Sequence, residues 1–243
     1  MVNLQELEKI FFKKVYPGKS RYPLYRSIFS WLLEAAVFCQ QEVKVKVLNI
    51  YSSHDRSSDR EDIYRNYFFS SADYQELDFS RDAFIDDSGA SHDDHIVPFS
   101  NETFDLVITT KVILEHVSNP QKVINEFYRI LKKGGEAFLI APLVRRQHQT
   151  PYDFFRFSEF ALEHLLKKAG FEIVYIKPSN GAVTTAAFMS TFFVSGLPWP
   201  LLIKKAFFGL IKLAVDPISN FLDRYDRDRK IPIYFLIRVR KIA

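Results

Sequence analysis

One polar segment in the second half of the chain carries residues that could move a proton. Within residues 143–157, LVRRQHQTPYDFFRF, the side chains of His148, Tyr152, Asp153 and Arg156 lie close together in sequence. An imidazole can accept a proton near neutral pH, while a carboxylate and a guanidinium can orient a polar ligand. Two interpretations of the charged residues stay open: Asp153 and Arg156 contact a substrate, or they pair with each other and only shape the loop.

Metal chemistry is not predicted from the histidines. Their spacing, with His54, His92, His95 and His116 in the first half of the chain, is not that of a zinc site, and no HExxH motif is present. The single cysteine, Cys39, excludes both an internal disulfide framework and a cysteine-rich metal site. We therefore expect no metal, and we expect Cys39 to be a core thiol in a helix.

The elements that position these residues are clearest between residues 104 and 142. An apolar run at 104–108 predicts a buried strand, and Pro120 can open a helix whose apolar residues recur at helical spacing. Gly134 and Gly135 are expected to end that helix in a left-handed cap, before a second strand at 137–141. A strand–helix–strand unit of this length requires parallel pairing of its two strands.

The same stretch resembles class I S-adenosylmethionine (SAM)-dependent methyltransferases of the small, single-domain type. That resemblance implies an α/β fold with a doubly wound, mostly parallel seven-stranded sheet, and its last two strands form an antiparallel hairpin. N-terminal helices and a helical insertion before the last strand are expected to elaborate this Rossmann-like fold. The matching residues are Pro98, Phe99, Phe104, Asp105, Leu114, Glu115, His116, Val117, Pro120, Glu126, Arg129, Leu131, Lys132, Gly134 and Gly135.

The family's glycine-rich cofactor turn is the point at which this sequence departs from the resemblance. Ile50, Tyr51, Ser52 and Ser53 follow the predicted first strand, and Tyr51 stands where the first glycine belongs. A side chain at a position that needs positive φ costs roughly 1–3 kcal/mol, unless the loop takes another path. Two alternatives follow: SAM binds through Ser52 and Ser53 with altered geometry, or binding has been lost.

The resemblance implies further roles for individual residues. Asp78, at the end of the predicted second strand, would accept hydrogen bonds from the ribose hydroxyls of SAM, although a solvated loop acid is the alternative. Asp93 or Asp94 would contact the adenine amino group. The remaining assignments are Thr110 at the cofactor, His116, Asp153 and Arg156 at the substrate, and His148 and Tyr152 in catalysis, with His148 as the base.

Two regions lie outside the expected core. Residues 1–42 are predicted to form an N-terminal helical cap, which either covers the sheet edge or acts as a lid. Residues 43–243 are predicted to form the α/β domain, with a helical insertion at 180–230. Because residues 178–203 carry no charge and Lys204, Lys205 and Lys212 follow, the segment 182–215 is interpreted as a membrane-surface helix, a cap or dimer interface, or a membrane span.

Composition limits the remaining possibilities. A chain of 243 residues suits one elaborated α/β domain, and a formal charge of +4 is too small to argue for nucleic acid. The N-terminus lacks the pattern of a signal peptide, so we expect a cytoplasmic protein, peripheral on the inner membrane face in the membrane interpretation. The predicted function is methyl transfer from SAM to a small-molecule or lipid- or sugar-linked acceptor. The alternative is a catalytically inactive scaffold subunit, and a homodimer is compatible with either.

Overall fold

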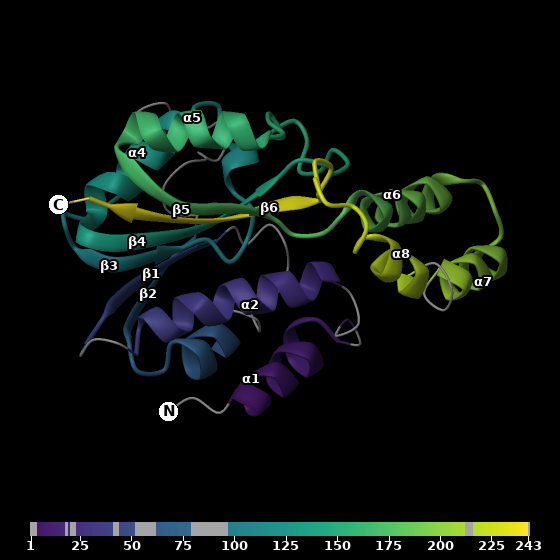
Figure 1. Cartoon of the computed structure of the whole chain (residues 1–243), viewed down its shortest axis with the longest axis horizontal. Helices are drawn as coiled ribbons and strands as arrows, with labels where there is room; N and C mark the ends of the chain where they lie inside the picture. The colour runs from purple at the N-terminus through teal and green to yellow at the C-terminus, as the bar shows by residue number, and fades with distance from the viewer. Residues whose placement is uncertain are drawn as a thin grey trace.

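A six-stranded sheet lies at the centre of the molecule, in the order β2-β1-β3-β4-β6-β5 (Figure 1). The computed structural model describes residues 4–17, 19, 23–40, 44–51, 62–78, 97–211 and 216–242. Within these residues the strands are β1 (Lys46–Tyr51), β2 (Asp73–Asp78), β3 (Phe104–Ile108), β4 (Leu131–Pro142), β5 (Phe171–Pro178) and β6 (Tyr234–Lys241).

The pairing of the strands confirms the predicted topology. β1 pairs in parallel with both β2 and β3, and β3 pairs in parallel with β4. β6 is antiparallel to both β4 and β5, which gives the predicted hairpin at the sheet edge. The strand count differs from the prediction, since the described residues contain six strands rather than seven. The long connection between β2 and β3, residues 79–96, lies outside the described part of the chain.

Helices cover both faces of the sheet (Figure 1). On one face lie α4 (Pro120–Ile130) and α5 (Glu159–Ala169); on the other lie α1 (Leu4–Ile10), the π-helix η1 (Phe11–Val15), α2 (Pro23–Phe38) and a second π-helix, η2 (Tyr64–Phe68). Local signals mark both ends of α5. Ser158 accepts a hydrogen bond from the Ala161 N–H at 3.2 Å, and Gly170 ends the helix with φ +98°.

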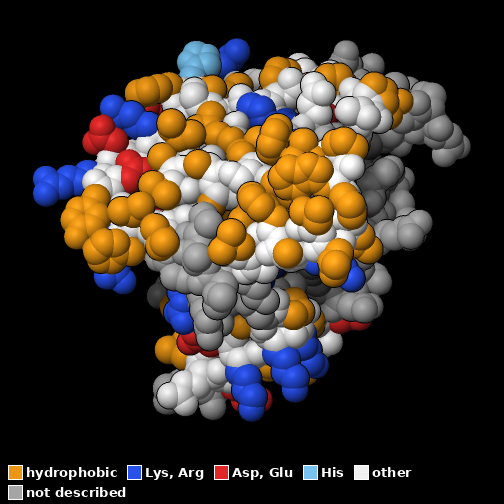
Figure 2. Space-filling model, turned by 90° about the vertical axis from the view of Figure 1, so that its right-hand side faces the viewer, with side chains coloured by type: hydrophobic (Ala, Val, Ile, Leu, Met, Phe, Trp, Pro, Cys, Tyr) orange, Lys and Arg blue, Asp and Glu red, His pale blue; other side chains and the backbone are white. Residues whose placement is uncertain are grey.

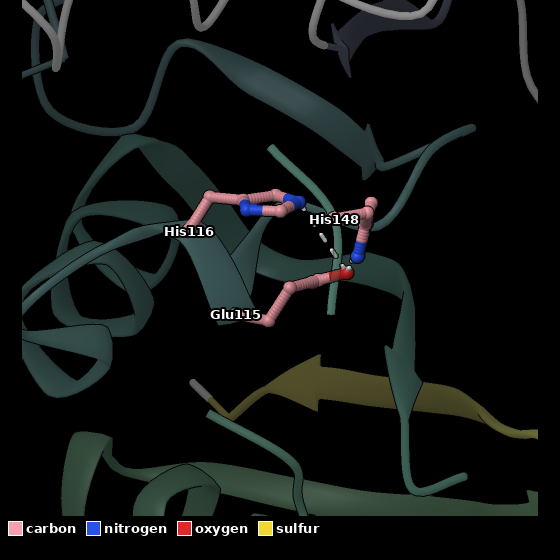
Figure 3. A group of neighbouring side chains, drawn as sticks. All are labelled: Glu115, His116 and His148. Atoms are coloured by element: carbon pink, nitrogen blue, oxygen red, sulfur yellow. Dashed lines mark ion pairs between the residues drawn. The ribbon is translucent and has the colours of Figure 1, made fainter. Parts of the chain in front are cut away.

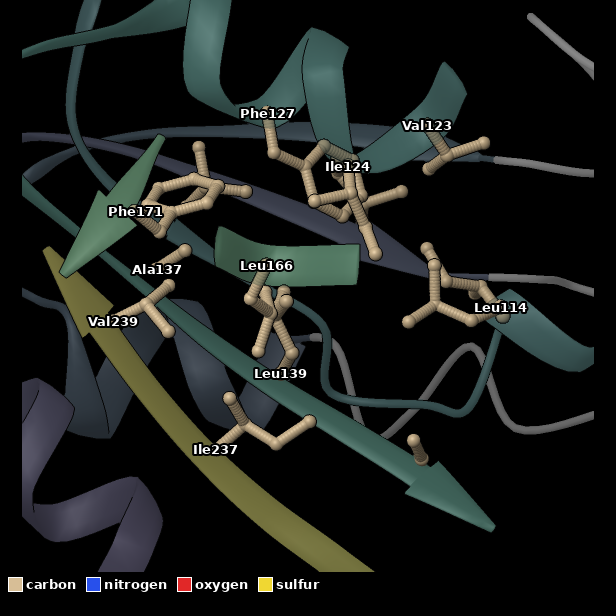
Figure 4. Packing of buried hydrophobic residues seen from close by; sticks show 14 of the residues in the cluster. Leu114, Val123, Ile124, Phe127, Ala137, Leu139, Leu166, Phe171, Ile237 and Val239 are labelled. Carbon is tan, nitrogen blue, oxygen red and sulfur yellow. The ribbon is translucent and has the colours of Figure 1, made fainter. Parts of the chain in front are cut away.

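Alternation along the strands divides the core into two hydrophobic clusters. In β4, Ala137 and Leu139 pack with α4 and α5 (Figure 4), whereas Phe138 and Ile140 point toward the N-terminal helices. Trp31 of α2 lies 5.9 Å from the Phe138 ring, centroid to centroid, and donates a hydrogen bond to the Ile237 carbonyl at 3.2 Å. The N-terminal helices therefore cover a face of the sheet and not its edge, which corrects one of the two interpretations above.

The connection from α4 to β4 differs from the predicted glycine cap. Leu131 ends the helix in an extended conformation and already pairs with Phe104. Gly134 lies inside β4 with φ +78°, where the pairing register shifts between Phe104 and Leu106. β4 begins at Leu131, directly after the last residue of α4, so Gly134 lies within the strand. Its positive φ accommodates the irregular pairing there.

In the described part of the segment between β5 and β6, three helices project from the end of the sheet (Figure 1). They are α6 (Ala182–Gly196), α7 (Leu201–Leu210) and α8 (Asp216–Leu222), and we call them the arm. No helix within the described residues is long and apolar enough to span a membrane. The described part of residues 182–215 therefore does not contain a membrane span, which was one interpretation of this segment.

Candidate functional site

A cavity of about 400 Å³ opens where the carboxyl ends of the central strands face the arm. Ligands of open α/β sheets bind in this position, outside the carboxyl ends of the strands. Segments far apart in sequence build its wall: the N-terminal helices, the residues after β3, the loop after β4, α6 and the start of β6. The lining includes Tyr16, Tyr25, Thr110, Lys111, His116, Arg145, His148, Phe188, Phe192 and Tyr234.

The predicted cofactor residues lie at neighbouring strand ends. Tyr51 and Asp78 are register partners at the last positions of β1 and β2, and Asp78 is 6% exposed. Thr110, just beyond β3, donates from its backbone N–H and its hydroxyl to the side-chain oxygen of buried Asn49, at 3.3 and 3.0 Å. The side chain of Ile50 is fully buried in the core, so only its backbone is available at this edge.

The strain considered for Tyr51 does not occur. Tyr51 is the final residue of β1 and is not among the described non-glycine residues with positive φ. Tyr51 therefore has the extended backbone of a strand, which a tyrosine adopts freely. The Lys111 ammonium lies 5.5 Å from the centre of the Tyr51 ring. Ser52, Ser53, Asp93 and Asp94 lie outside the described residues.

Asp153 and Arg156 pair with each other in the loop after β4. The guanidinium of Arg156 donates to both carboxylate oxygens of Asp153 at 2.6 and 2.7 Å, and also to the carbonyls of Arg145 and Arg146 at 3.1 Å. The backbone N–H of His148 donates to the same carboxylate at 2.9 Å. These two residues therefore hold the loop that presents His148 to the cavity, and their predicted contact with a substrate stays a prediction.

Glu115, His116 and His148 form a compact cluster beside the cavity (Figure 3). Glu115 and His116 belong to the 3-10 helix η3 (Leu114–His116), whereas His148 comes from the loop after β4. The carboxylate oxygen Oε1 of Glu115 lies 3.6 Å from His116 Nε2 and 3.8 Å from His148 Nε2. The two imidazole rings meet edge to face with centroids 4.7 Å apart. Sequence reasoning placed the two histidines in the site but did not assign a role to Glu115.

Burial controls the protonation of the cluster. Loss of hydration raises the pKa of Glu115 to about 7 and lowers that of His116. Burial, followed by the charge of Arg145, lowers the pKa of His148 to about 4, so this imidazole is neutral at pH 7. Burial also acts to raise the pKa of Asp153, but the hydrogen bonds from Arg156 and from the His148 backbone outweigh it and bring the pKa to about 2.

Tyr152 meets the cluster through its backbone. Its carbonyl accepts a hydrogen bond from His116 Nδ1 at 2.7 Å, which orients the imidazole. The catalytic role predicted for its side chain stays a prediction. Phe188 and Phe192 of α6 were not assigned to the site from the sequence, although their separation by one helical turn, which places both rings on one face, is a signal that could have found them.

Comparison with known proteins identifies the family. A model of the methyltransferase domain matches residues 35–176, more than half of the chain. The chain belongs to this methyltransferase-domain family. The matched segment contains the strand ends, η3 and the whole loop after β4, so Tyr51, Asp78, Glu115 and His148 all lie within it. No curated protein matches the sequence.

Solved structures share the fold at low sequence identity. The chain matches one from the complex between the Haloferax volcanii Trm112 methyltransferase activator and the putative methyltransferase, with 12% identity, 98% of each chain covered and a TM-score of 0.50. A putative sarcosine dimethylglycine methyltransferase from Galdieria sulphuraria has 10% identity, 98% coverage of each chain and a TM-score of 0.47. A putative methyltransferase from Bacillus halodurans has 16% identity and a TM-score of 0.46, with 86% of this chain and 99% of that chain covered.

Proposed function

We propose that the protein transfers a methyl group from SAM to a hydroxyl or amine of a lipid-linked acceptor at a membrane surface. Family membership supports the reaction class, and the cavity at the strand ends supports the location of the chemistry. The observation that carries the acceptor class is the composition of the cavity wall. One side is the polar cluster around Glu115, and the other is α6, a helix that continues outward into the exposed arm.

The described residues fit SAM at the end of the sheet. Asp78 places a carboxylate, which accepts two hydroxyl donors at once, beside the last residue of β1, in the position suited to the ribose. Tyr51 leaves the strand without a strained backbone, so the lack of glycine there does not by itself oppose binding. When bound, SAM supplies the methyl group as an electrophile on its sulfonium sulfur.

The chain's own residues provide placement and proton handling. Methyl transfer depends mainly on holding the acceptor atom in line with the methyl group. Phe188 and Phe192 form an apolar wall that can hold the acceptor's hydrocarbon and exclude water. The acceptor also loses a proton when the new bond forms, and the cluster of Glu115, His116 and His148 is the polar group placed to assist that loss.

Calorimetric titration with S-adenosylhomocysteine tests cofactor binding. We expect Asp78→Asn to weaken binding at least tenfold, because hydrogen bonds to a charged acceptor contribute about 1.5–3 kcal/mol. Asp73→Asn is the matched control, since Asp73 is exposed at the opposite end of the same strand and should leave binding unchanged. If the wild-type protein gives no heat at millimolar ligand, the inactive scaffold becomes the better description and the enzyme proposal fails.

The arm supplies the argument for a lipid-linked acceptor. No residue of α7 is buried, and Leu201, Leu202 and Ile203 are 68%, 79% and 50% exposed. Figure 2, which faces the arm, shows hydrophobic side chains gathered on this side of the molecule. No acidic residue occurs from position 173 to 215, while Lys204 and Lys205 follow the exposed leucines. An apolar face with basic residues and no acids is complementary to an anionic lipid surface.

The aromatic residues of α6 connect the arm with the cavity. Phe188 and Phe192 line the cavity, and the neighbouring Phe193 is 70% exposed on the surface of the same helix. An acyl or polyprenyl chain could therefore run from the cavity along α6 to the exposed face of α7. In this proposal the headgroup to be methylated reaches the polar cluster while its hydrocarbon remains at the membrane.

Vesicle flotation tests this part of the proposal separately. The double variant Leu202→Ser, Ile203→Ser should bind vesicles that contain phosphatidylglycerol about 100-fold more weakly, because each buried aliphatic side chain contributes about 1.5 kcal/mol or more. Ile242→Ser is the matched control, since it removes an equally exposed apolar side chain, 56% exposed, at the opposite end of the sheet. Unchanged flotation of the double variant would refute the arm as the membrane contact. Conversion of a dimer to a monomer by the same variant, with flotation unchanged, would identify a dimer interface instead.

A further inference from the structure

The Glu115–His116–His148 cluster has the composition and the unsatisfied atoms of a metal site (Figure 3). One ligand-type atom of each residue lies within 4.8 Å of the others. Glu115 is fully buried, and neither of its carboxylate oxygens has a hydrogen-bond partner among the described residues; the same holds for His116 Nε2. A buried carboxylate without a partner is unfavourable, because its lost hydration is not replaced. A cation between the three side chains would replace it.

The hydrogen bond on the far side of His116 fixes which nitrogen faces the cluster. A carbonyl can only accept, so the 2.7 Å contact with the Tyr152 carbonyl places the ring proton on His116 Nδ1. The lone pair of the neutral imidazole then lies on Nε2, which is the atom 3.6 Å from the Glu115 oxygen. Histidines that bind metals are oriented in this way, by donation of the other ring N–H to a carbonyl or carboxylate.

His148 also turns one ring nitrogen toward Glu115, but its other nitrogen makes no hydrogen bond within the described residues. Its Nε2 faces the Glu115 oxygen at 3.8 Å, while its Nδ1 lies 3.4 Å from a carboxylate oxygen of Asp153. Asp153 is in turn fixed by the two hydrogen bonds from Arg156. At this distance Asp153 is only an electrostatic neighbour, because His148 Nδ1 has no hydrogen-bond partner among the described residues, while the other ring nitrogen is turned toward the cluster.

The charges around the cluster are compatible with a cation. Arg156 is paired with Asp153, and Arg145, the other nearby guanidinium, donates to the hydroxyl of Tyr234 at 2.8 Å. Glu115 contributes the negative charge that faces the site directly. The charges of both guanidiniums act on Glu115, but neither donates a hydrogen bond to its carboxylate within the described residues, so the carboxylate oxygens remain available to a metal ion.

We infer that Glu115, His116 and His148 bind one divalent transition-metal ion of the zinc class, with the open side of the site toward the cavity. Ligand atoms of a tetrahedral zinc site are about 3.3 Å apart, given metal–ligand distances near 2.0–2.1 Å. The distances of 3.6 and 3.8 Å from the Glu115 oxygen need to shorten by only a few tenths of an ångström. Because the three ligand atoms lie within 4.8 Å of one another, the largest separation has to shorten by up to about 1.5 Å. Two imidazoles and one carboxylate suit Zn²⁺, Co²⁺ or Fe²⁺, whereas Mg²⁺ and Ca²⁺ prefer sites made of oxygen atoms.

The position of the site suggests how such an ion would be used. His116 and His148 both line the cavity, so the fourth position of the ion would open into it. Three protein ligands with an open position are typical of catalytic rather than structural zinc sites. If the proposed methyl transfer is correct, an acceptor oxygen bound at that position would have a lowered pKa and would be a better nucleophile. Metal binding itself does not depend on that reaction.

Titration of the full-length, chelator-treated protein with Co²⁺ and Zn²⁺ tests the inference. We expect one ion per chain, the visible absorption bands of Co²⁺ in a site of low symmetry, and their loss when Zn²⁺ is added. Glu115→Gln and His148→Ala should each weaken binding at least 100-fold. His164→Ala is the matched control, because His164 is an exposed histidine on α5 and should leave binding unchanged.

Each outcome decides between the alternatives. Absence of binding by the wild-type protein at micromolar metal, or equal binding by wild type and both site variants, would overturn the inference. If Glu115→Gln does not fold, His148→Ala gives the answer, because His148 is on a surface loop and 17% exposed. A parallel titration with S-adenosylhomocysteine separates the proposals: cofactor binding without metal binding refutes only the metal site, and metal binding without cofactor binding refutes only the methyltransferase activity.

Discussion

The position of α6, and with it the apolar wall of the cavity, depends on the carboxylate of Asp223, just beyond α8. This buried carboxylate accepts hydrogen bonds from three backbone N–H groups at the start of α6: Gly181 at 2.9 Å, Val183 at 3.0 Å and Thr184 at 3.2 Å. The N-cap residue, Gly181, has no side chain that could satisfy them. The first turn of α6 is therefore capped by a residue 42 positions further along the chain from Gly181, and this contact joins the start of α6 to the end of α8.

The expected loss on Asp223→Ala follows from these contacts. Each of the three hydrogen bonds contributes about 1 kcal/mol net, and a negative charge at a helix N-terminus adds about 0.5–1 kcal/mol. We expect the free energy of unfolding to fall by about 3–4 kcal/mol. Asp223→Asn keeps one acceptor oxygen but removes the charge, so it should lose about 1–2 kcal/mol. Domains of this kind are stable by about 5–15 kcal/mol, so both variants should still fold.

Urea denaturation followed by circular dichroism measures the change. Asp228→Ala is the matched control: its carboxylate is 71% exposed and pairs only with the exposed Lys230, so its loss should be under about 0.5 kcal/mol. A loss below about 1 kcal/mol for Asp223→Ala would refute the capping argument, because three buried N–H groups cannot lose their acceptor at so small a cost.

A double-mutant cycle tests the same contact from the other side. A Cβ atom on Gly181 would lie 2.6 Å from Cγ of Asp223, closer than any ordinary contact. Gly181→Ala should therefore destabilise the wild-type protein by about 2 kcal/mol or more. In the Asp223→Ala background the contacts with Asp223 are absent and the 2.9 Å contact with Asp226 Oδ2 remains, so the two losses should be less than additive by at least about 1 kcal/mol. Additive losses would show that the two residues do not interact.

Two further predictions concern the sheet and the N-terminal face. Glu136 is fully buried between Arg238 and Arg240, so Glu136→Gln should lower the free energy of unfolding by about 2–4 kcal/mol in urea denaturation. The control Glu163→Gln, in an exposed helical pair, should lower it by under about 0.5 kcal/mol. Equal losses in the two variants would contradict a structural role for the buried ion pairs of Glu136. Burial raises the pKa of Cys39 from 9.0 to about 12, so the folded state keeps a proton that the unfolded state releases and stability falls as pH rises through that interval. The slope of the unfolding free energy against pH between 9 and 12 should therefore be smaller in Cys39→Ala, by up to about 1.4 kcal/mol per pH unit, and an unchanged slope would refute this assignment.

Local patterns in the sequence were sufficient for the central part of the fold. β3 has the predicted bounds because a short apolar run between polar residues suits only a buried strand. α4 begins at the predicted Pro120, with Asn119 as its N-cap, and α5 lies between its capping residues Ser158 and Gly170. In each case the signal is a spacing or a cap within a few residues, so no distant contact is needed to read it.

The helix-to-strand junction at Gly134 shows where such local reasoning fails. Two glycines after an amphipathic helix usually mark its end, and this pattern predicted a cap. Here the helix already ends at Ile130, since Leu131 pairs with Phe104, and the positive φ of Gly134 serves the strand instead. Strand register decided the role of the glycine, and register is a property of the neighbouring strand.

The sequence by itself determined the strand–helix–strand unit at 104–142 and the methyltransferase resemblance, because hydrophobic periodicity and short motifs encode them locally. Only the tertiary structure decided the composition of the site. It brought Glu115 to His148, which is 33 positions further along the chain. This contact depends on the paths of two loops that meet at the strand ends. The spacing of residues in the sequence does not specify the distance between the two loops, because the packing of the core beneath them determines it.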